Sequence, residues 1–200
     1  ARMQSPLWRH FNAENLLVAA GLLLAHGYTL DAALGPLESC SAPAGRMQIV
    51  GRYAGMPLVV VDFAHTPDAL SKAIGVVRQH CAGKVSVVFG CGGDRDKGKR
   101  GEMGSVAAQL ADRIIVTDDN PRNEDPRAIV AAILAGMGAA GNATVEHDRA
   151  RAIRRAIETA GPDDVVLLAG KGSESYQLIG AHSLPFADAD VATAVLEGLT

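Results

Sequence analysis

Residues 58–199 alternate between short apolar runs of strand length and longer segments with a helical pattern, and this alternation constrains the fold more than any other feature. Two parallel strands must be joined by a crossover of about a dozen residues or more, and these helical segments are long enough to supply it. We therefore predict an α/β fold with a mainly parallel sheet that is covered by helices on both faces. The expected pairs of strand and helix are Leu58–Phe63 with Pro67–His80, Val85–Phe89 with Lys99–Ala111, Ile114–Thr117 with Pro126–Gly136, Ala143–Glu146 with Arg149–Ala160, and Val165–Ala169 with Ala189–Leu199.

A short helical segment precedes this pattern. A first helix is expected from Asn12 to Ala25, with Gly27 ending it, and a second from Thr29 to Leu37. The stretch Ser-Ala-Pro-Ala-Gly at positions 41–45 is typical of a domain boundary. We predict two parts, residues 1–44 and residues 45–200.

Composition excludes several classes of partner. The 200 residues carry a formal net charge of -3, and the 19 basic residues are scattered along the chain, which argues against a nucleic-acid or membrane partner. Residues 1–15 lack the apolar core of a signal peptide, and the apolar run at 16–25 is too short to span a bilayer. Cys40, Cys81 and Cys91 are odd in number and lack zinc-like spacing, so we expect free thiols in a reducing cytosol.

Three polar loops follow three of the predicted strands. The loop Asp119-Asn120-Pro121-Arg122 combines an amide and a guanidinium with a rigid proline, and a guanidinium can hold a carboxylate at two points. The loop at 90–100 contains Arg95, and the third loop covers residues 169–174. Ligands of parallel sheets bind at the carboxyl ends of the strands, so the three loops predict a site for a small, charged ligand.

Other interpretations of these loops are weaker or remain open. Gly93 to Arg100 resembles a phosphate-binding Walker A loop, but Arg100 stands where that loop needs Ser or Thr to hold magnesium. A G-x-G-x-x-G fingerprint is absent from the same loop, which disfavours a nicotinamide-dependent dehydrogenase. Asp62 and His65 end another strand, where they either contact a ribose, a phosphate or a metal-bound water, or have a structural role.

Four segments together resemble the bacterial muramyl-peptide ligases, and among them the members that add diaminopimelate. The resemblance implies a family of three domains, which bind a UDP-sugar, ATP and the incoming amino acid. This chain would be the C-terminal, Rossmann-like, amino-acid-binding domain, and residues 1–44 would be the end of the central ATP-binding domain. The segments are Val61-Asp-Phe-Ala-His-Thr-Pro-Asp-Ala-Leu70, Phe89-Gly-Cys-Gly-Gly-Asp-Arg-Asp-Lys-Gly-Lys-Arg100, Thr117-Asp-Asp-Asn-Pro-Arg122 and Ala169-Gly-Lys-Gly-Ser-Glu174, and Phe11-Asn-Ala-Glu-Asn15 matches the central domain.

The resemblance also implies site residues and partners. The partners are meso-diaminopimelate, UDP-N-acetylmuramoyl-L-alanyl-D-glutamate, ATP and the remaining domains of the ligase, with Mg²⁺ and most of the ATP bound outside this chain. No catalytic residue and no metal ligand is assigned within the chain. The residues implied to bind diaminopimelate are Arg95, Asp119, Asn120, Pro121, Arg122, Gly170 and Glu174, and those implied to lie near ATP are Asn15, Arg46, Asp62 and His65.

In the family, the amine of the incoming amino acid attacks an acyl phosphate made from the carboxylate of the nucleotide substrate, so this chain would position one reactant and be inactive alone. Two positions depart from the family pattern, because Ser173 stands where His is usual and Phe63 where Tyr is usual. The alternative is a stand-alone module that binds an amino acid or a nucleotide. A ligase origin predicts an exposed apolar surface between Leu16 and Leu24, whereas a stand-alone module would cover it.

Overall fold

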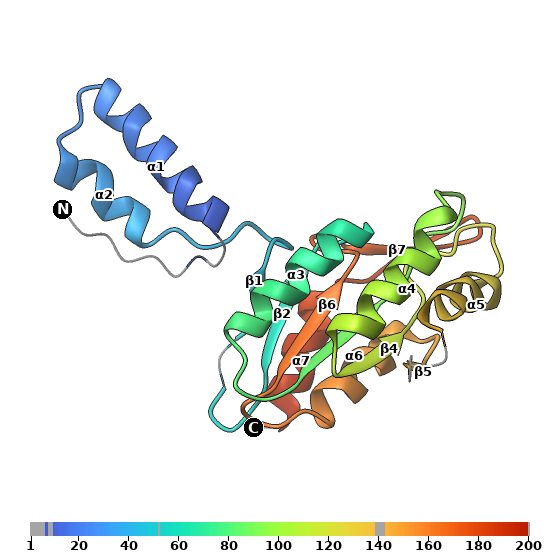
Figure 1. Cartoon of the computed structure of the whole chain (residues 1–200). Helices are drawn as coiled ribbons and strands as arrows, with labels where there is room; N and C mark the ends of the chain where they lie inside the picture. The colour runs from blue at the N-terminus through green and yellow to red at the C-terminus, as the bar shows by residue number, and fades with distance from the viewer. Residues whose placement is uncertain (1–6, 8–9, 52, 139–142, 200) are drawn as a thin grey trace. The chain divides into compact units, whose positions relative to one another are not determined.

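The computed structural model describes residues 7, 10–51, 53–138 and 143–199. It divides into two compact units, residues 1–43 and residues 44–200 (Figure 1). Most of the first nine residues, for which the sequence predicts no signal peptide, lie outside the described part of the chain. Within that part, no helix has the length and apolar character needed to cross a membrane.

The first unit is a pair of helices, α1 (His10–Ala25) and α2 (Leu30–Glu38). Thr29 caps α2, because its side chain accepts a hydrogen bond from the amide of Ala32. Leu16, Ala20 and Leu37 are buried together between the helices. Elsewhere on α1 large apolar side chains are exposed, with Leu17 71%, Val18 63%, Leu22 59% and Leu24 43% exposed.

The second unit contains a six-stranded sheet with the order β1-β2-β6-β3-β4-β5. Strands β2 to β6 are parallel to one another, which confirms the predicted mainly parallel sheet. The strands are β1 (Gln48–Ile49), β2 (Leu58–Asp62), β3 (Val85–Phe89), β4 (Arg113–Val116), β5 (Ala143–Val145) and β6 (Val165–Ala169), and the helices are α3 (Pro67–Gln79), α4 (Gly98–Leu110), α5 (Pro126–Met137), α6 (Arg149–Glu158) and α7 (Asp188–Leu199).

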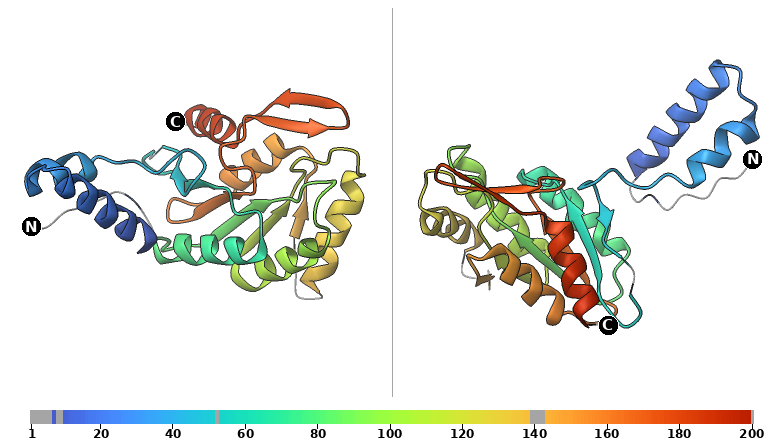
Figure 2. Two further views of the ribbon diagram at one scale, coloured as in Figure 1. Left: turned by 90° about the horizontal axis from the view of Figure 1, so that it is seen from above. Right: turned by 180° about the vertical axis from the view of Figure 1, so that it is seen from behind.

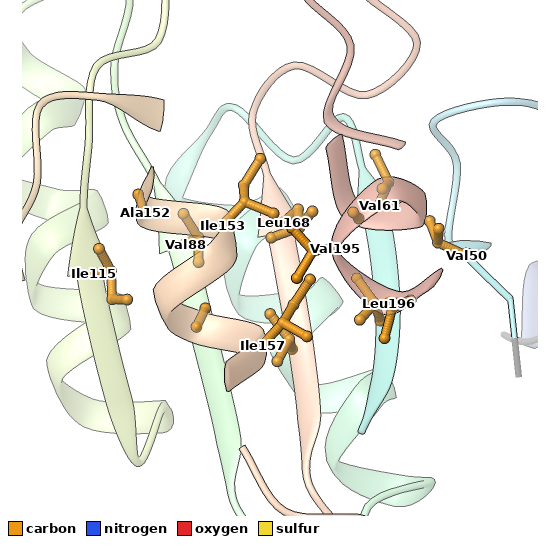
Figure 3. Packing of buried hydrophobic residues seen from close by; sticks show 14 residues of the cluster. Val50, Val61, Val88, Ile115, Ala152, Ile153, Ile157, Leu168, Val195 and Leu196 are labelled. Carbon is orange, nitrogen blue, oxygen red and sulfur yellow. The ribbon is translucent and has the colours of Figure 1, made fainter. Parts of the chain in front are cut away.

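Helices cover both faces of the sheet, as expected. Figure 2 shows α3, α4 and α5 along one face and α6 and α7 along the other. Strands β3 and β6 are buried at every residue, because a central parallel strand packs against helices on both sides. Figure 3 shows the core on the second face, where side chains of α6 and α7 pack against those of the strands.

Some local predictions are confirmed and some elements were missed. Thr66 followed by Pro67 is a sequence typical of a capped helix start, and the structure confirms it for α3, since the Thr66 side chain accepts a hydrogen bond from the amide of Ala69 and Pro67 opens the helix. The sequence does not predict β1, which pairs antiparallel with β2, or the hairpin of β7 (Tyr176–Ile179) and β8 (His182–Pro185). Strand β1 has only two residues, and β8 is exposed along its whole length, so neither has the buried alternation by which a strand is recognised.

Candidate functional site

The order of the strands gathers four loops at one end of the sheet. Strand β6 lies between β2 and β3, so the loop after β6 lies between the loops that follow β2 and β3. The loop after β4 completes the group, and together the four loops enclose a cavity of about 410 Å³. Its lining comprises Phe63, His65, Gly90, Cys91, Gly92, Arg95, Asp96, Lys99, Asp119, Asn120, Arg122, Gly170, Glu174 and Tyr176.

The loop of residues 119–122 is held in place by the β7–β8 hairpin. Arg122 has a left-handed backbone with φ of 51°, which is uncommon outside glycine. Its amide donates to the carbonyl of Leu178 at 3.0 Å, and its carbonyl accepts from the amide of Gly180 at 2.7 Å. The Arg122 Nη1 atom donates to the carbonyl of Gly93 at 2.9 Å, which leaves other guanidinium N–H groups for a ligand.

Gly93 lets the loop after β3 pack directly on this loop. Its amide donates to the carbonyl of Asn120 at 2.9 Å, and a Cβ at position 93 would overlap the carbonyl oxygen of Pro121. Pro121 is buried and supports the loop without lining the cavity. The glycines of this motif therefore allow close packing of two backbones.

Asn120, Lys171 and Glu174 form one hydrogen-bonded network at the base of the cavity. The Asn120 Nδ2 atom donates to Glu174 Oε2 at 2.8 Å. The Lys171 Nζ atom donates to Asn120 Oδ1 at 3.1 Å, to Glu174 Oε2 at 3.0 Å and to the carbonyl of Tyr176 at 2.7 Å. Lys171 is completely buried, and Asn120 is 1% exposed. Such a network holds its members in single orientations.

Buried carboxylates and cations lie together around the base of the cavity. Burial raises the pKa of Asp119, and the nearby cations Arg149 and Lys171 oppose this shift. Arg149 is itself paired with Asp188 at 2.7 Å, and both side chains are fully buried. An ammonium group placed beside Asp119 and Glu174 would favour the ionised form of both carboxylates.

The cavity also carries cationic side chains. Arg95, Lys99 and Arg122 line it, and Arg95 is exposed. Lys99 donates from Nζ to the carbonyl of His65 at 2.9 Å, which joins the start of α4 to the loop after β2. Burial raises the pKa of the Cys91 thiol to about 11, so this cavity residue is a neutral thiol at pH 7 and not a nucleophile. The arrangement suits a zwitterion, because carboxylate and ammonium groups both find opposite charges.

The predicted ATP-binding residues fall in different places. The Arg46 guanidinium lies 4.9 Å from the centroid of the Phe63 ring, and the Phe63 and His65 rings are 4.5 Å apart. Asp62 is buried, and its Oδ2 accepts a hydrogen bond from the amide of Met47 at 2.9 Å. Asp62 therefore holds the 45–48 turn in place, while Arg46 and His65 are exposed beside Phe63. Asn15 is an exposed residue of α1, in the first unit.

The structure thus brings together six of the seven residues expected to bind an amino acid, and Pro121 supports them from below. The sequence does not predict the cavity residues Lys99 and Tyr176, or Lys171 and Gln177, which support the cavity. The involvement of Lys171 could have been predicted from the sequence, because it lies between Gly170 and Glu174, two residues of the predicted site. The role of Gln177 could not have been predicted, because only the fold of the β7–β8 hairpin brings its Nε2 to 2.9 Å from the carbonyl of Asp119. Among the residues that the structure describes, no cluster of His, Cys, Asp or Glu is suited to hold a metal ion.

Comparison with known proteins decides the family. Residues 45–172 match the family model of the Mur ligase, glutamate ligase domain. The chain belongs to the Mur ligase family. A curated relative, UDP-N-acetylmuramoyl-L-alanyl-D-glutamate–2,6-diaminopimelate ligase of Vibrio vulnificus (strain YJ016), is 47% identical over 195 residues, which are 98% of this chain and 39% of the relative. The chain thus spans about two fifths of the length of this Mur ligase.

Solved Mur ligase structures share the fold. A structure of UDP-N-acetylmuramoyl-L-alanyl-D-glutamate–2,6-diaminopimelate ligase has a TM-score of 0.77 and 38% identity, over 98% of this chain and 40% of that one. UDP-N-acetylmuramate-alanine ligase from Thermotoga maritima has a TM-score of 0.67 at 19% identity, over 98% of this chain and 39% of that one. The second likeness concerns the fold alone.

Ser173 is exposed next to a tight backbone contact. A Cβ at Gly45 would overlap the backbone of Gly172 and Ser173, and a Cβ at Gly172 would approach Phe63 Cβ to 2.7 Å. Both glycines also have positive φ, of 69° and 54°. The packing of the 45–47 turn on the 170–174 loop therefore fixes the backbone at Ser173, and the Ser173 side chain lies at the surface.

Proposed function

We propose that this chain is the amino-acid-binding part of an ATP-dependent ligase of the bacterial cytoplasm. The ligase joins meso-diaminopimelate to UDP-N-acetylmuramoyl-L-alanyl-D-glutamate in the synthesis of peptidoglycan precursors. The observation that carries this proposal is the cavity at the carboxyl ends of the strands, which is lined by both cationic side chains (Arg95, Lys99, Arg122) and carboxylates (Asp119, Glu174). The 47% identity to a ligase of that name supports the choice of substrate.

The cavity holds one end of diaminopimelate by its two charged groups. Arg122 binds the carboxylate in a bidentate manner, and Arg95 adds a second cation from the loop after β3. Glu174 and Asp119 accept hydrogen bonds from the ammonium group at the same end. Gly170 leaves room for this group, since a Cβ there would approach Asp119 Oδ2 to 2.9 Å. Lysine lacks the distal carboxylate and would leave Arg122 without its partner.

The other end of diaminopimelate supplies the attacking amine. ATP activates the carboxylate of the UDP-linked substrate as an acyl phosphate, and the amine then displaces phosphate to form the amide. The contribution of this chain is to hold the amine in one position and orientation, which removes the entropic cost of bringing two reactants together. No side chain of the chain is assigned a proton transfer.

Arg46 and His65 are the residues of this chain that contact the nucleotide. Their charged or polar ends are exposed beside Phe63, where a phosphate can reach both. Asp62 acts indirectly, by holding the turn that carries Arg46. Asn15 contributes from the first unit, and most ATP contacts and Mg²⁺ belong to residues outside this chain.

The exposed apolar side of α1 favours the ligase over a stand-alone binding module. Leu17, Val18 and Leu22 are each more than half exposed, and a module that functions alone would bury such a surface. We propose that residues 1–44 are the end of the central ATP-binding domain and that this surface packs against the rest of that domain.

The proposal is tested by an NMR titration of the chain with meso-diaminopimelate and with L-lysine. Diaminopimelate should shift the signals of Arg95, Asn120, Arg122 and Glu174, and lysine should not. Arg122→Met should weaken diaminopimelate binding by several kcal/mol, on the order of 2–5, because it removes one partner of a desolvated charge pair. Arg127→Met is the control, since Arg127 is exposed and outside the cavity.

Four results would contradict this assignment. Equal binding of lysine and diaminopimelate would refute the specificity, and full binding by the Arg122→Met variant would refute the role of Arg122. Binding of a nucleotide but of neither amino acid at this cavity would favour the stand-alone module. ATP-dependent ligation by the 200 residues alone would refute the proposal that the activity also needs the other domains of the ligase.

A further inference from the structure

We infer that Lys171 is a positioning residue that fixes the Asn120 amide and the Glu174 carboxylate in the orientations needed to receive the ligand. This inference rests on the proposed function, because it deepens the description of the same cavity. Lys171 does not line the cavity itself. It acts from beneath, through two residues that do.

Lys171 is a fully buried cation whose hydrogen-bonding capacity is used completely within the protein. An ammonium group has three donors, and Nζ has three acceptors: Asn120 Oδ1 at 3.1 Å, Glu174 Oε2 at 3.0 Å and the Tyr176 carbonyl at 2.7 Å. A buried ammonium is costly unless it is paired and hydrogen-bonded, and this one meets both conditions. Lys171 therefore has no donor left for a ligand, and its effect is confined to its partners.

The network determines which way the Asn120 amide faces. The Oδ1 atom accepts from Lys171 Nζ and from the amide of Leu178 at 2.9 Å, and Nδ2 donates to Glu174 Oε2. An amide flipped by half a turn would direct its NH₂ group at two donors and its oxygen at a carboxylate. Only the observed orientation satisfies every contact, and it leaves one N–H of Nδ2 to donate to a ligand.

The same network determines which oxygen of Glu174 faces the ligand. Oε2 accepts from both Lys171 and Asn120, and Glu174 also lines the cavity. Oε1 takes part in neither bond and is the oxygen left to accept from an ammonium group. Without Lys171 the carboxylate can rotate about its last bond, so the ligand would have to order it on binding and would lose affinity.

The test is the variant Lys171→Met, which keeps the length of the side chain and removes the ammonium group. The matched control is Lys72→Met, since Lys72 is exposed and pairs only with Asp68 on the surface of α3. In the ligand-free variant the side-chain amide signals of Asn120 should move and broaden, and diaminopimelate binding should weaken by roughly tenfold or more, the loss expected when hydrogen bonds of a charged group are removed. The control Lys72→Met should change neither the Asn120 side-chain signals nor the affinity for diaminopimelate.

Each outcome separates this inference from the proposed function. A folded Lys171→Met protein with unchanged Asn120 side-chain signals and unchanged affinity overturns the inference. If the wild-type chain does not bind diaminopimelate, the proposed function fails, while the Asn120 signals of the ligand-free variant still decide the role of Lys171. A variant that does not fold is replaced by a measurement on the wild type, in which the Lys171 ammonium protons should exchange slowly with solvent and should shift in Glu174→Gln. Rapid exchange of those protons overturns the inference.

Discussion

Removal of the Asp188 carboxylate is expected to destabilise residues 44–200 strongly, because it leaves the Arg149 guanidinium buried without a counter-charge. Arg149 Nε and Nη2 donate to the two Asp188 oxygens, each at 2.7 Å, and Nη2 also donates to the carbonyl of Ala169 at 3.0 Å. Neither side chain has any solvent exposure. The pair joins the starts of α6 and α7 to the end of β6, directly below the ligand cavity.

The size of the effect follows from the burial of the pair. Breaking one partner of a buried ion pair costs about 3–5 kcal/mol, whereas replacing both partners by apolar residues of similar volume is often close to neutral. For a domain of this size each kcal/mol lowers the melting temperature by roughly 2–4 °C, so Asp188→Ala should lower it by about 6–20 °C. The double variant Arg149→Met with Asp188→Leu should recover most of this loss.

Urea denaturation followed by circular dichroism measures the free energies of unfolding of the wild type, of the single variants Arg149→Met and Asp188→Leu and of the double variant, which form a double-mutant cycle, and also that of Asp188→Ala. The expected result is a large coupling between the two positions, with the double variant more stable than Asp188→Ala alone. The reasoning is refuted if Asp188→Ala costs less than about 1 kcal/mol, the value typical of an exposed ion pair. It is equally refuted if the losses of the two single variants simply add.

Two further changes test the loops around the cavity. Hydrogen bonds from Arg100 lower the pKa of Glu124 to about 2, so this carboxylate stabilises the fold fully above its ordinary pKa of 4.5 and loses its contribution as the pH falls towards 2. Glu124→Gln should therefore lower stability at pH 7 and flatten the acid side of a stability profile, and a profile of unchanged slope would contradict the assignment. Gly93→Ala should destabilise the protein by about 1–3 kcal/mol and weaken ligand binding, because the added methyl group overlaps Pro121. Its control is Gly75→Ala in α3, which meets nothing within 4 Å and should be stabilising by up to about 1 kcal/mol in thermal unfolding.

Much of the site was predictable because the chain places its polar loops directly after apolar strands. In a parallel sheet the carboxyl ends of all strands meet at one edge, so Arg95, Asn120, Arg122 and Glu174 were expected to lie together before any side chain was placed. The sequence could not predict which residues of the site, such as Lys171, support the cavity without lining it. Lys171 and Glu174 are separated by only two residues, yet nothing in the sequence indicates that one is fully buried and the other faces the cavity.

The sequence by itself determined the α/β class, the cap of α3 and the membership in the ligase family, since each depends on local periodicity, short-range hydrogen bonds or recognisable motifs. The tertiary structure alone decided that β6 is inserted between β2 and β3, that a hairpin holds the 119–122 loop, and that Asp62 supports a turn. The physical reason is that periodicity records which side of an element is buried, whereas the order of strands and the partner of a buried polar group depend on segments far apart in the chain.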